Sequence, residues 1–263
     1  MTACTISIEA TGAVATLYRT VLASMPNSYR IVHDGAEVVL VSATDPSRIQ
    51  QVCSGETRAV VIDRPGRLSS DELAAIAVAA DRHDCIVVPA VLYGARADGA
   101  ADLLGTAHVD LLESTVISPE GLRSSLVEQL AVLRTVLGSV ASVRVLHGSV
   151  SHYVLEATMA DHPKSHVLLN GLSLSNVVDE VTLQAIGPEL HVKIRIDADP
   201  LARPAEIHCY HRDGGTSPWP LHQHAHRLTL ARLHRLLTGR DGDLSYSLND
   251  LRHDLQLAEA LPG

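Results

Sequence analysis

The clearest pattern of apolar and polar positions lies between residues 58 and 96. Two near-continuous apolar runs, Ala59 to Ile62 and Cys85 to Leu92, flank a segment whose apolar residues have helical spacing. Strands with helices on both faces lose the alternation of apolar and polar residues, and a helix that packs on a sheet shows one apolar stripe. The segment therefore predicts two parallel strands joined by a helix that begins at Ser69 or Ser70.

The residues before this segment continue the alternation of strands and helices. Strands are expected at Thr5 to Glu9 and Glu37 to Ala43, and helices at Val14 to Met25 and Ser47 to Cys53. Residues 1–105 are therefore expected to form an α/β domain, a reduced Rossmann-like layer built on a parallel sheet.

The second half changes to strands that alternate on one face. A helix at residues 119–138 is followed by strand patterns with turn residues between them, and two helices close the chain, at residues 221–238 and 248–261. The expected strands are 106–117, 142–150, 165–174, 179–186, 190–197 and 205–212. We therefore expect an α+β domain with an open, mostly antiparallel sheet over residues 106–263, with the boundary near Gly105.

Two segments resemble a known family. The run VVIDRPGRLSSDELAAIAVAADRHDCIVVPAVLYGAR and the chain end SYSLNDLRHDLQLAEAL are similar to segments of the glucose-fructose oxidoreductase and inositol dehydrogenase family (Gfo/Idh/MocA). The resemblance implies an N-terminal nicotinamide-binding Rossmann domain and a C-terminal domain with an open sheet. It places Asp63 where the family has Glu, Arg64 where it has the catalytic Lys, and Arg96 where it often has Arg.

The cofactor-binding turn departs from the family pattern. A dinucleotide site reads G-x-G-x-x-G after the first strand, but the turn here is EATGAVA with a single Gly12. Between Ala10 and Glu37 there is also too little chain for two βαβ repeats, so one repeat, with the acidic residue that binds the ribose, is expected to be missing. The sequence thus predicts a truncated domain without cofactor, with NAD(P) binding as the alternative.

The residues expected to carry chemistry are Arg64, Tyr93 and Glu128. The resemblance puts Glu128 in place of the family's catalytic His and Ser124 in place of its Asp. Arg stays protonated, so Arg64 could orient an anion but could not act as a general acid. Each of these residues also has a purely structural explanation. Arg64 could form an ion pair, Tyr93 could be a partly buried wall residue whose hydroxyl is hydrogen-bonded, and Glu128 could be a carboxylate that interacts favourably with the helix dipole.

Four residues are expected to contact substrate: Asp63, Arg96, Lys193 and His208. The last two belong to a polar strand face, with His191, Arg195, Glu206 and Tyr210, that could be the floor of a pocket for an anionic substrate. A solvated sheet face or a dimer interface explains the same pattern. In the resembling family such faces often meet across a dimer, so a homo-oligomer through the C-terminal sheet is expected.

Composition and charge restrict the classes of partner and ligand that the protein is expected to bind. A formal net charge of −9 disfavours nucleic acid and anionic membrane surfaces. Four separated cysteines without a C-x-x-C pair indicate buried reduced thiols, and the absence of a long apolar run favours a cytoplasmic protein. His222 and His226 have metal-ligand spacing on a helix, but no third ligand is placed nearby, so no metal is expected.

Three functions remain open. The first is cofactor-independent acid-base chemistry on a small metabolite, such as a cyclisation, isomerisation, dehydration or elimination. The second is NAD(P)-dependent oxidoreduction with unusual motifs, and the third is a non-catalytic partner or scaffold. The first is preferred because polar side chains gather at the predicted crevice, although a fold does not fix a function.

Overall fold

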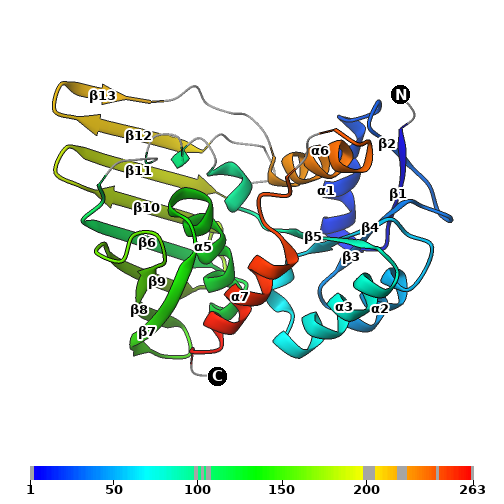
Figure 1. Cartoon of the computed structure of the whole chain (residues 1–263), viewed down its shortest axis with the longest axis horizontal. Helices are drawn as coiled ribbons and strands as arrows, with labels where there is room; N and C mark the ends of the chain where they lie inside the picture. Colours follow the sequence, from blue (N-terminus) through cyan, green and yellow to red (C-terminus); the bar gives the residue numbers. More distant parts are fainter. Residues whose placement is uncertain are drawn as a thin grey trace. The chain divides into compact units, whose positions relative to one another are not determined.

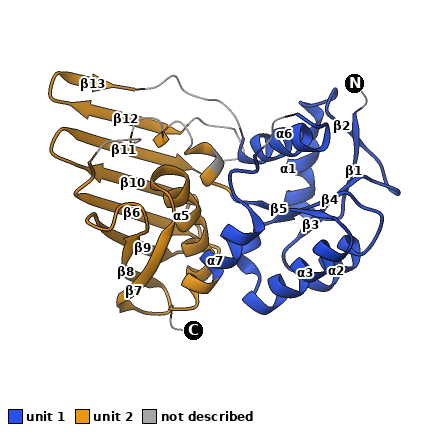
Figure 2. Ribbon diagram, in the orientation of Figure 1, with its two compact units in different colours: residues 1–91, 224–255 blue, residues 92–223, 256–263 orange. Residues whose placement is uncertain are grey.

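The computed structural model describes residues 3–97, 100–101, 104, 108–197, 205–217, 224–240 and 243–261. The chain forms two compact units, shown in separate colours in Figure 2. Unit 1 comprises Met1–Val91 and His224–Leu255, and unit 2 comprises Leu92–Gln223 and Gln256–Gly263. The boundary expected from the sequence, near Gly105, lies outside the described residues. Unit 1 is discontinuous along the chain, because a helix from the end of the chain packs on its sheet.

Unit 1 is built on a five-stranded sheet in the order β2-β1-β3-β4-β5, and every pairing is parallel (Figure 1). Its strands are β1 (Cys4–Ile8), β2 (Tyr29–Ile31), β3 (Val38–Ser42), β4 (Ala59–Asp63) and β5 (Ile86–Ala90). This confirms the parallel Rossmann-like sheet expected from the sequence. The expected strands correspond to all of these except β2, for which no strand was expected.

Helices cover both faces of this sheet. α1 (Gly12–Ala23) and α6 (Ala225–Leu237) pack on one face, against alternate strand residues such as Ile6, Leu40 and Val61. α2 (Pro46–Cys53) and α3 (Ser70–Arg82) pack together against β3, β4 and β5. Burial on both sides explains why the strands read as continuous apolar runs. A last helix, α7, spans Leu248–Ala258.

The start of α3 agrees with the capping expected from its sequence. Ser69 is the N-cap, and its hydroxyl accepts a hydrogen bond from the Glu72 backbone N–H at 3.2 Å. The Glu72 carboxylate accepts the Ser69 backbone N–H at 2.7 Å in return. This reciprocal capping box fixes the first turn of α3 directly after the end of β4.

The connection between β2 and β3 is unusually short. Ile6 of β1 pairs with Ile31 on one side and with Val38 on the other, so residues 32–37 must cross β1 without a helix. Parallel crossovers usually need a dozen or more residues.

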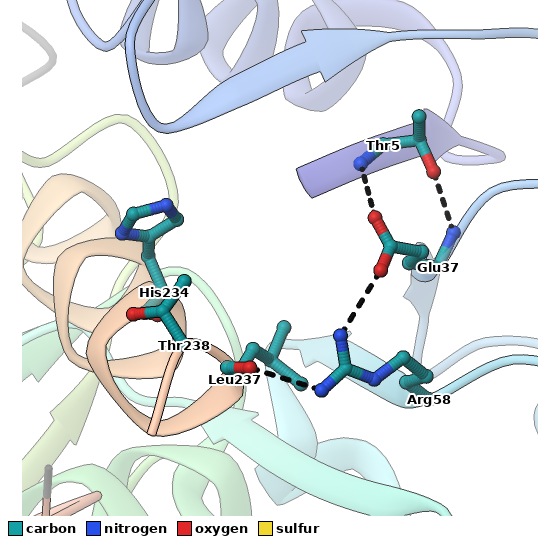
Figure 3. A network of polar contacts seen from close by, with 6 residues as sticks. All are labelled: Thr5, Glu37, Arg58, His234, Leu237 and Thr238. Atoms are coloured by element: carbon teal, nitrogen blue, oxygen red, sulfur yellow. Dashed lines mark hydrogen bonds and ion pairs between the residues drawn. The ribbon is translucent and has the colours of Figure 1, made fainter. Parts of the chain in front are cut away.

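Side-chain hydrogen bonds hold this crossing in place (Figure 3). The Glu37 carboxylate accepts the Thr5 N–H at 3.0 Å, and the Thr5 hydroxyl accepts the Glu37 N–H at 2.9 Å. The bond from Thr5 N–H is the main cause that lowers the pKa of Glu37. Arg58 adds an ion pair to Glu37 at 3.0 Å and donates to the Leu237 carbonyl at the end of α6 at 2.9 Å. These contacts tie the crossing to β1, β4 and α6.

Unit 2 contains an eight-stranded sheet in the order β13-β12-β11-β10-β6-β9-β8-β7. Every described pairing is antiparallel except that of β6 with β9. α5 (Leu122–Leu137) packs on one face. The strands are β6 (Leu111–Ser118), β7 (Val140–Gly148), β8 (His152–Met159), β9 (His166–Ser173), β10 (Glu180–Ile186), β11 (Leu190–Asp197), β12 (Glu206–His211) and β13 (Gly214–Thr216). The mostly antiparallel sheet is confirmed, although β8 and β13 were not expected.

Among the described residues, no helix has both the length and the apolar character needed to cross a membrane. All four cysteines are buried and free, as expected for reduced thiols.

Candidate functional site

Asp63 is the centre of a buried polar cluster at the carboxyl end of β4. It is only 2% exposed, and its Oδ1 accepts a hydrogen bond from the Tyr18 hydroxyl of α1 at 3.1 Å. The same oxygen lies 3.3 Å from Nε2 of His226, in the first turn of α6. The Tyr18 and His226 rings also pack together, with centroids 4.4 Å apart. We call these three residues the Asp63 cluster.

Arg64 follows in a left-handed conformation, with φ of +52°. L-residues other than Gly, Asn and Asp rarely adopt this region, and such strain is concentrated at functional sites. The residue leads directly into the short 3-10 helix η1 (Pro65–Arg67). The Nε of Arg64 is 3.9 Å from Oδ2 of Asp63, and its side chain is 35% exposed. The predicted pairing of Arg64 with Asp63 is therefore present at long range.

The surroundings of His226 indicate which ring nitrogen donates to Asp63. An ionised carboxylate only accepts hydrogen bonds, so Nε2 carries the proton that faces Asp63. The other ring nitrogen, Nδ1, is buried and has no hydrogen-bond partner among the described residues. A neutral imidazole in this orientation presents a buried lone pair at Nδ1. Buried polar atoms without a partner are few in native structures, so this one needs an explanation.

Asp63→Asn is expected to lower the free energy of unfolding by about 1–2 kcal/mol. The amide keeps one acceptor oxygen but removes the charge that serves both Tyr18 and His226. Urea unfolding measures the change. Asp81→Asn on the exposed side of α3 is the matched control and is expected to stay within about 0.5 kcal/mol of the wild type. Equal effects in both variants would contradict the role given to Asp63.

The turn after β1 fits a dinucleotide better than its sequence suggested. Gly12 opens α1 with φ of +61°, and a Cβ built there would meet nothing within 4 Å. Ala15, three positions later, is buried. In the fingerprint G-x-G-x-x-G/A, the second Gly admits the pyrophosphate and the last small residue allows close helix packing. Ala10, Gly12 and Ala15 match these positions except for the first Gly.

An acidic residue also follows β2. Asp34 lies about 20 residues after Gly12, the spacing at which dinucleotide sites bind the ribose hydroxyls. The sequence predicted the loss of this acidic residue with a missing repeat, because no strand was expected at Tyr29–Ile31. Asp34 lines a hollow of about 470 Å³ beside α2, together with Ser7, Glu9, His33, Arg48 and Glu56. Glu9, directly after β1, is paired with Arg48 through two hydrogen bonds of 2.6 Å, which balances its charge.

Three of the predicted site residues come together in unit 2. Tyr93 is 1% exposed, and its hydroxyl donates to Oδ1 of Asp179 at 2.5 Å. Burial is the main cause that raises the pKa of Tyr93, followed by the charge of Asp179. Glu128 of α5 accepts the Leu92 backbone N–H at 2.8 Å. Arg96, at the end of the 3-10 helix η2 (Gly94–Arg96), donates to the Asp197 carbonyl. Tyr93 is therefore a buried residue whose hydroxyl has a hydrogen-bond partner, which agrees with the structural explanation given for it above.

Lys193 and His208 lie elsewhere in unit 2. They are directly paired across β11 and β12, and both are exposed on the face opposite the buried residues Val192 and Ile194. His191 and Arg195 pair with Tyr210 and Glu206 in the same way. The polar strand face is therefore present as expected. Its use for substrate or for a dimer stays a prediction.

His222 and His226, in the histidine-rich segment, have the spacing of metal ligands on a helix. His222 lies outside the described residues, and His226 faces Asp63 rather than solvent. In the part of the chain that the structure describes, no group of three or more His, Cys, Asp or Glu could hold a metal ion.

No protein-family model and no curated protein matches the chain, but solved structures match it over nearly its whole length. An oxidoreductase from Sinorhizobium meliloti is 11% identical, covering 99% of this chain and 96% of that chain, with a TM-score of 0.77. An oxidoreductase from Agrobacterium radiobacter, in complex with NAD+, L-tartaric acid and magnesium, is 12% identical, with coverages of 98% and 95% and a TM-score of 0.70. The WlbA dehydrogenase from Bordetella pertussis, in complex with NADH and UDP-GlcNAcA, is 12% identical, with coverages of 98% and 95% and a TM-score of 0.73.

At these identities the likeness concerns the fold. The chain has the fold of these oxidoreductases, a Rossmann-like parallel-sheet unit together with a unit built on a mostly antiparallel sheet.

Proposed function

We propose that the protein is a nicotinamide-dependent oxidoreductase of the Gfo/Idh/MocA family that acts on a small metabolite. The observation that carries this proposal is the open Gly12 at the start of α1 together with Asp34 after the adjacent strand β2. Two structures of the same fold were solved with NAD+ or NADH, which supports it. The proposal replaces the expectation that no cofactor is bound. The five-stranded sheet remains compatible with the loss of one repeat from the six-stranded Rossmann order.

The residues around the β1–α1 turn would hold the dinucleotide. The first turn of α1 has no acidic residue and no side-chain cap, so its backbone N–H groups and helix dipole favour a pyrophosphate. Asp34 would accept hydrogen bonds from the ribose hydroxyls. A carboxylate at this position disfavours a 2′-phosphate, so we expect NAD to bind more tightly than NADP.

A bound nicotinamide would supply or accept the hydride, and the chain must then handle a proton. Arg64 occupies the position of the family's Lys but cannot release its proton near neutral pH. The Asp63 cluster offers a replacement, because His226 Nδ1 presents a lone pair while Asp63 fixes the opposite nitrogen. Burial raises the pKa of Tyr18 well above its usual value, and the charge of Asp63 raises it further. Tyr18 therefore stays protonated and orients Asp63. We propose that His226 Nδ1 holds the proton and that Arg64 binds an anionic group of the substrate.

The test is a titration with NADH and NADPH followed by nicotinamide fluorescence. The wild type is expected to bind NADH in the micromolar range, and Gly12→Ala is expected to weaken binding about 10-fold or more because a Cβ excludes the pyrophosphate. Gly239→Ala is a matched control, since Gly239 also has a positive φ and no neighbour within 4 Å of its Cβ position. Both substitutions carry similar backbone strain, so only the effect on binding should differ.

A second pair of variants tests the ribose contact. Asp34→Asn is expected to weaken NADH binding and reduce the preference over NADPH, whereas Glu56→Gln, in the same hollow, should change neither. The absence of binding of both dinucleotides by the folded wild type would reject the proposal. Binding that Gly12→Ala leaves unchanged would place the dinucleotide elsewhere.

Cofactor-independent acid-base chemistry is the second candidate. It is favoured by Arg64 and Glu128, which stand where the resembling family has its Lys and His. If the folded protein binds neither NADH nor NADPH, this candidate takes precedence. Arg64→Ala or Glu128→Gln would then have to abolish a reaction without changing the far-ultraviolet circular dichroism. A scaffold role would predict no such loss.

A further inference from the structure

Two histidines lie together near the turn between β7 and β8, at the outer edge of the unit 2 sheet (Figure 1). His147 of β7 is paired with Val154 of β8, and His152 is two positions before Val154. The two histidines are therefore diagonal neighbours across the hairpin, an arrangement in which large side chains still reach each other. Val154 and His152 alternate with the buried Tyr153, so both imidazoles lie on the same face of the sheet.

The main chain around this pair is held by hydrogen bonds. The Ser149 N–H donates to the His152 carbonyl at 2.8 Å, which closes the turn. The Ser173 N–H at the end of β9 donates to the Ser151 carbonyl at 2.8 Å, and His152 is itself paired with Leu172 of β9. The backbone is therefore already ordered on both sides of the pair, and a ligand bound by the two rings need not order it.

The distance between the rings suits one tetrahedral metal ion. The centroids of His147 and His152 are 5.5 Å apart, and the ring planes are inclined by 43°. Zinc lies about 2.0–2.1 Å from an imidazole nitrogen, and thus about 3.2 Å from the ring centroid. Two imidazoles on one tetrahedral zinc ion have centroids about 5.2 Å apart, against about 4.5 Å for neighbouring positions of a square-planar ion. The observed separation is closer to the tetrahedral value.

Both rings are available to an ion. His147 is exposed and His152 is half-buried, and neither ring has a hydrogen-bond partner in the part of the chain that the structure describes. Arg144 precedes His147 in β7, and it forms a salt bridge with Glu156 across the hairpin. Its charge is therefore balanced, and it repels a cation less than an unpaired arginine would.

We propose that His147 and His152 form a surface binding site for a zinc ion, with water in the remaining coordination positions. Zinc sites that hold a fold together usually have four protein ligands, so two ligands indicate an exchangeable ion that folding does not require. The two imidazoles act as a chelate, because binding to one ring keeps the ion at a high effective concentration near the other. Both residues belong to unit 2, so the site is independent of the dinucleotide proposed for unit 1.

The test is a zinc titration of the folded, full-length protein, followed by the NMR signals of the histidine ring nitrogens. This measurement separates the pair from the histidine-rich segment at residues 222–226, since each ring gives its own signals. His147→Gln and His152→Gln assign the two rings. In the wild type both rings are expected to respond together at micromolar zinc. In each variant the remaining ring should need about 10-fold more zinc or higher, because the chelate is lost.

His166→Gln is the matched control. His166 is exposed at the start of β9 in the same sheet and has no ring partner among the described residues. This variant is expected to leave the response of His147 and His152 unchanged. Rings that respond at different zinc concentrations in the wild type, or a remaining ring that binds as tightly in either variant as in the wild type, would overturn the proposal. The wild-type titration decides the first of these without any variant.

Discussion

Raising the pH from neutral to about 11 is expected to remove about 3 kcal/mol of stability from each unit. Four of the six tyrosines have a pKa raised by burial, Tyr18 and Tyr29 in unit 1 and Tyr93 and Tyr153 in unit 2. Each is protonated in the folded protein at a pH where the unfolded chain has begun to ionise. One tyrosine contributes roughly 1–2 kcal/mol at one pH unit above the unfolded pKa of about 10.

Stability is lost, not gained, as the pH rises, because the pKa of each of these tyrosines is higher in the folded protein than in the unfolded chain. The stabilising contribution is fully present below the unfolded pKa and is lost progressively as the pH rises toward the folded value. Burial is the first cause in all four cases, and Asp63 and Asp179 add to it for Tyr18 and Tyr93. Tyrosinate absorbance and circular dichroism, followed together, are expected to change in one cooperative step. Ionisation of all six tyrosines near pH 10 without loss of structure would contradict the burial of these hydroxyls.

Gly171→Ala is expected to cost about 3–5 kcal/mol of stability in unit 2. A Cβ at Gly171 would lie 2.1 Å from two ring atoms of Tyr153, which is its direct cross-strand partner. The ring cannot move freely, because the Tyr153 hydroxyl donates to Gln129 at 2.9 Å and Gln129 donates to Ser114 at 2.9 Å. Displacing the ring would leave the buried amide of Gln129 without its donor, which adds to the steric cost.

A double-mutant cycle with Tyr153→Leu checks this explanation by urea unfolding. In the Tyr153→Leu background, Gly171→Ala is expected to cost less than about 1 kcal/mol, since the ring that it meets is gone. Equal costs in both backgrounds would assign the effect to the backbone of β9 instead of the contact with Tyr153.

The fold class could be predicted from the sequence because several of its elements have clear local patterns of apolar and polar residues. β4, α3 and β5 combine continuous apolar strands with a capped helix, and the alternation along β11 matches its burial residue by residue. β2 was missed because Tyr29–Ile31 is too short to show any period. β8 was missed although Tyr153, Leu155, Ala157 and Met159 alternate inward, a signal that a systematic search for period two would find.

The candidate site was harder to predict because its contacts join distant parts of the chain. Asp63 and Arg64 were identified from a local resemblance, but Tyr18 and His226 reach Asp63 only after α1 and α6 pack on one face of the sheet. His226 lies in a histidine-rich segment and was considered only as a metal ligand, so its contact with Asp63 was not predicted. Asp34 depended on recognising β2, and Gly12 with Ala15 is visible in the sequence once the last position of the fingerprint is allowed to be Ala.

The return of α6 to unit 1 has a consequence for synthesis on the ribosome. Leu230, Leu233 and Leu237 complete the apolar layer over β1, β3 and β4, yet they emerge after nearly all the rest of the polypeptide has been translated. The apolar face of the amino-terminal strands therefore stays exposed while the intervening residues are synthesised. Exposed apolar surface on a partly folded chain favours aggregation. Nascent chains that stall before residue 224 are accordingly the species most in need of a chaperone.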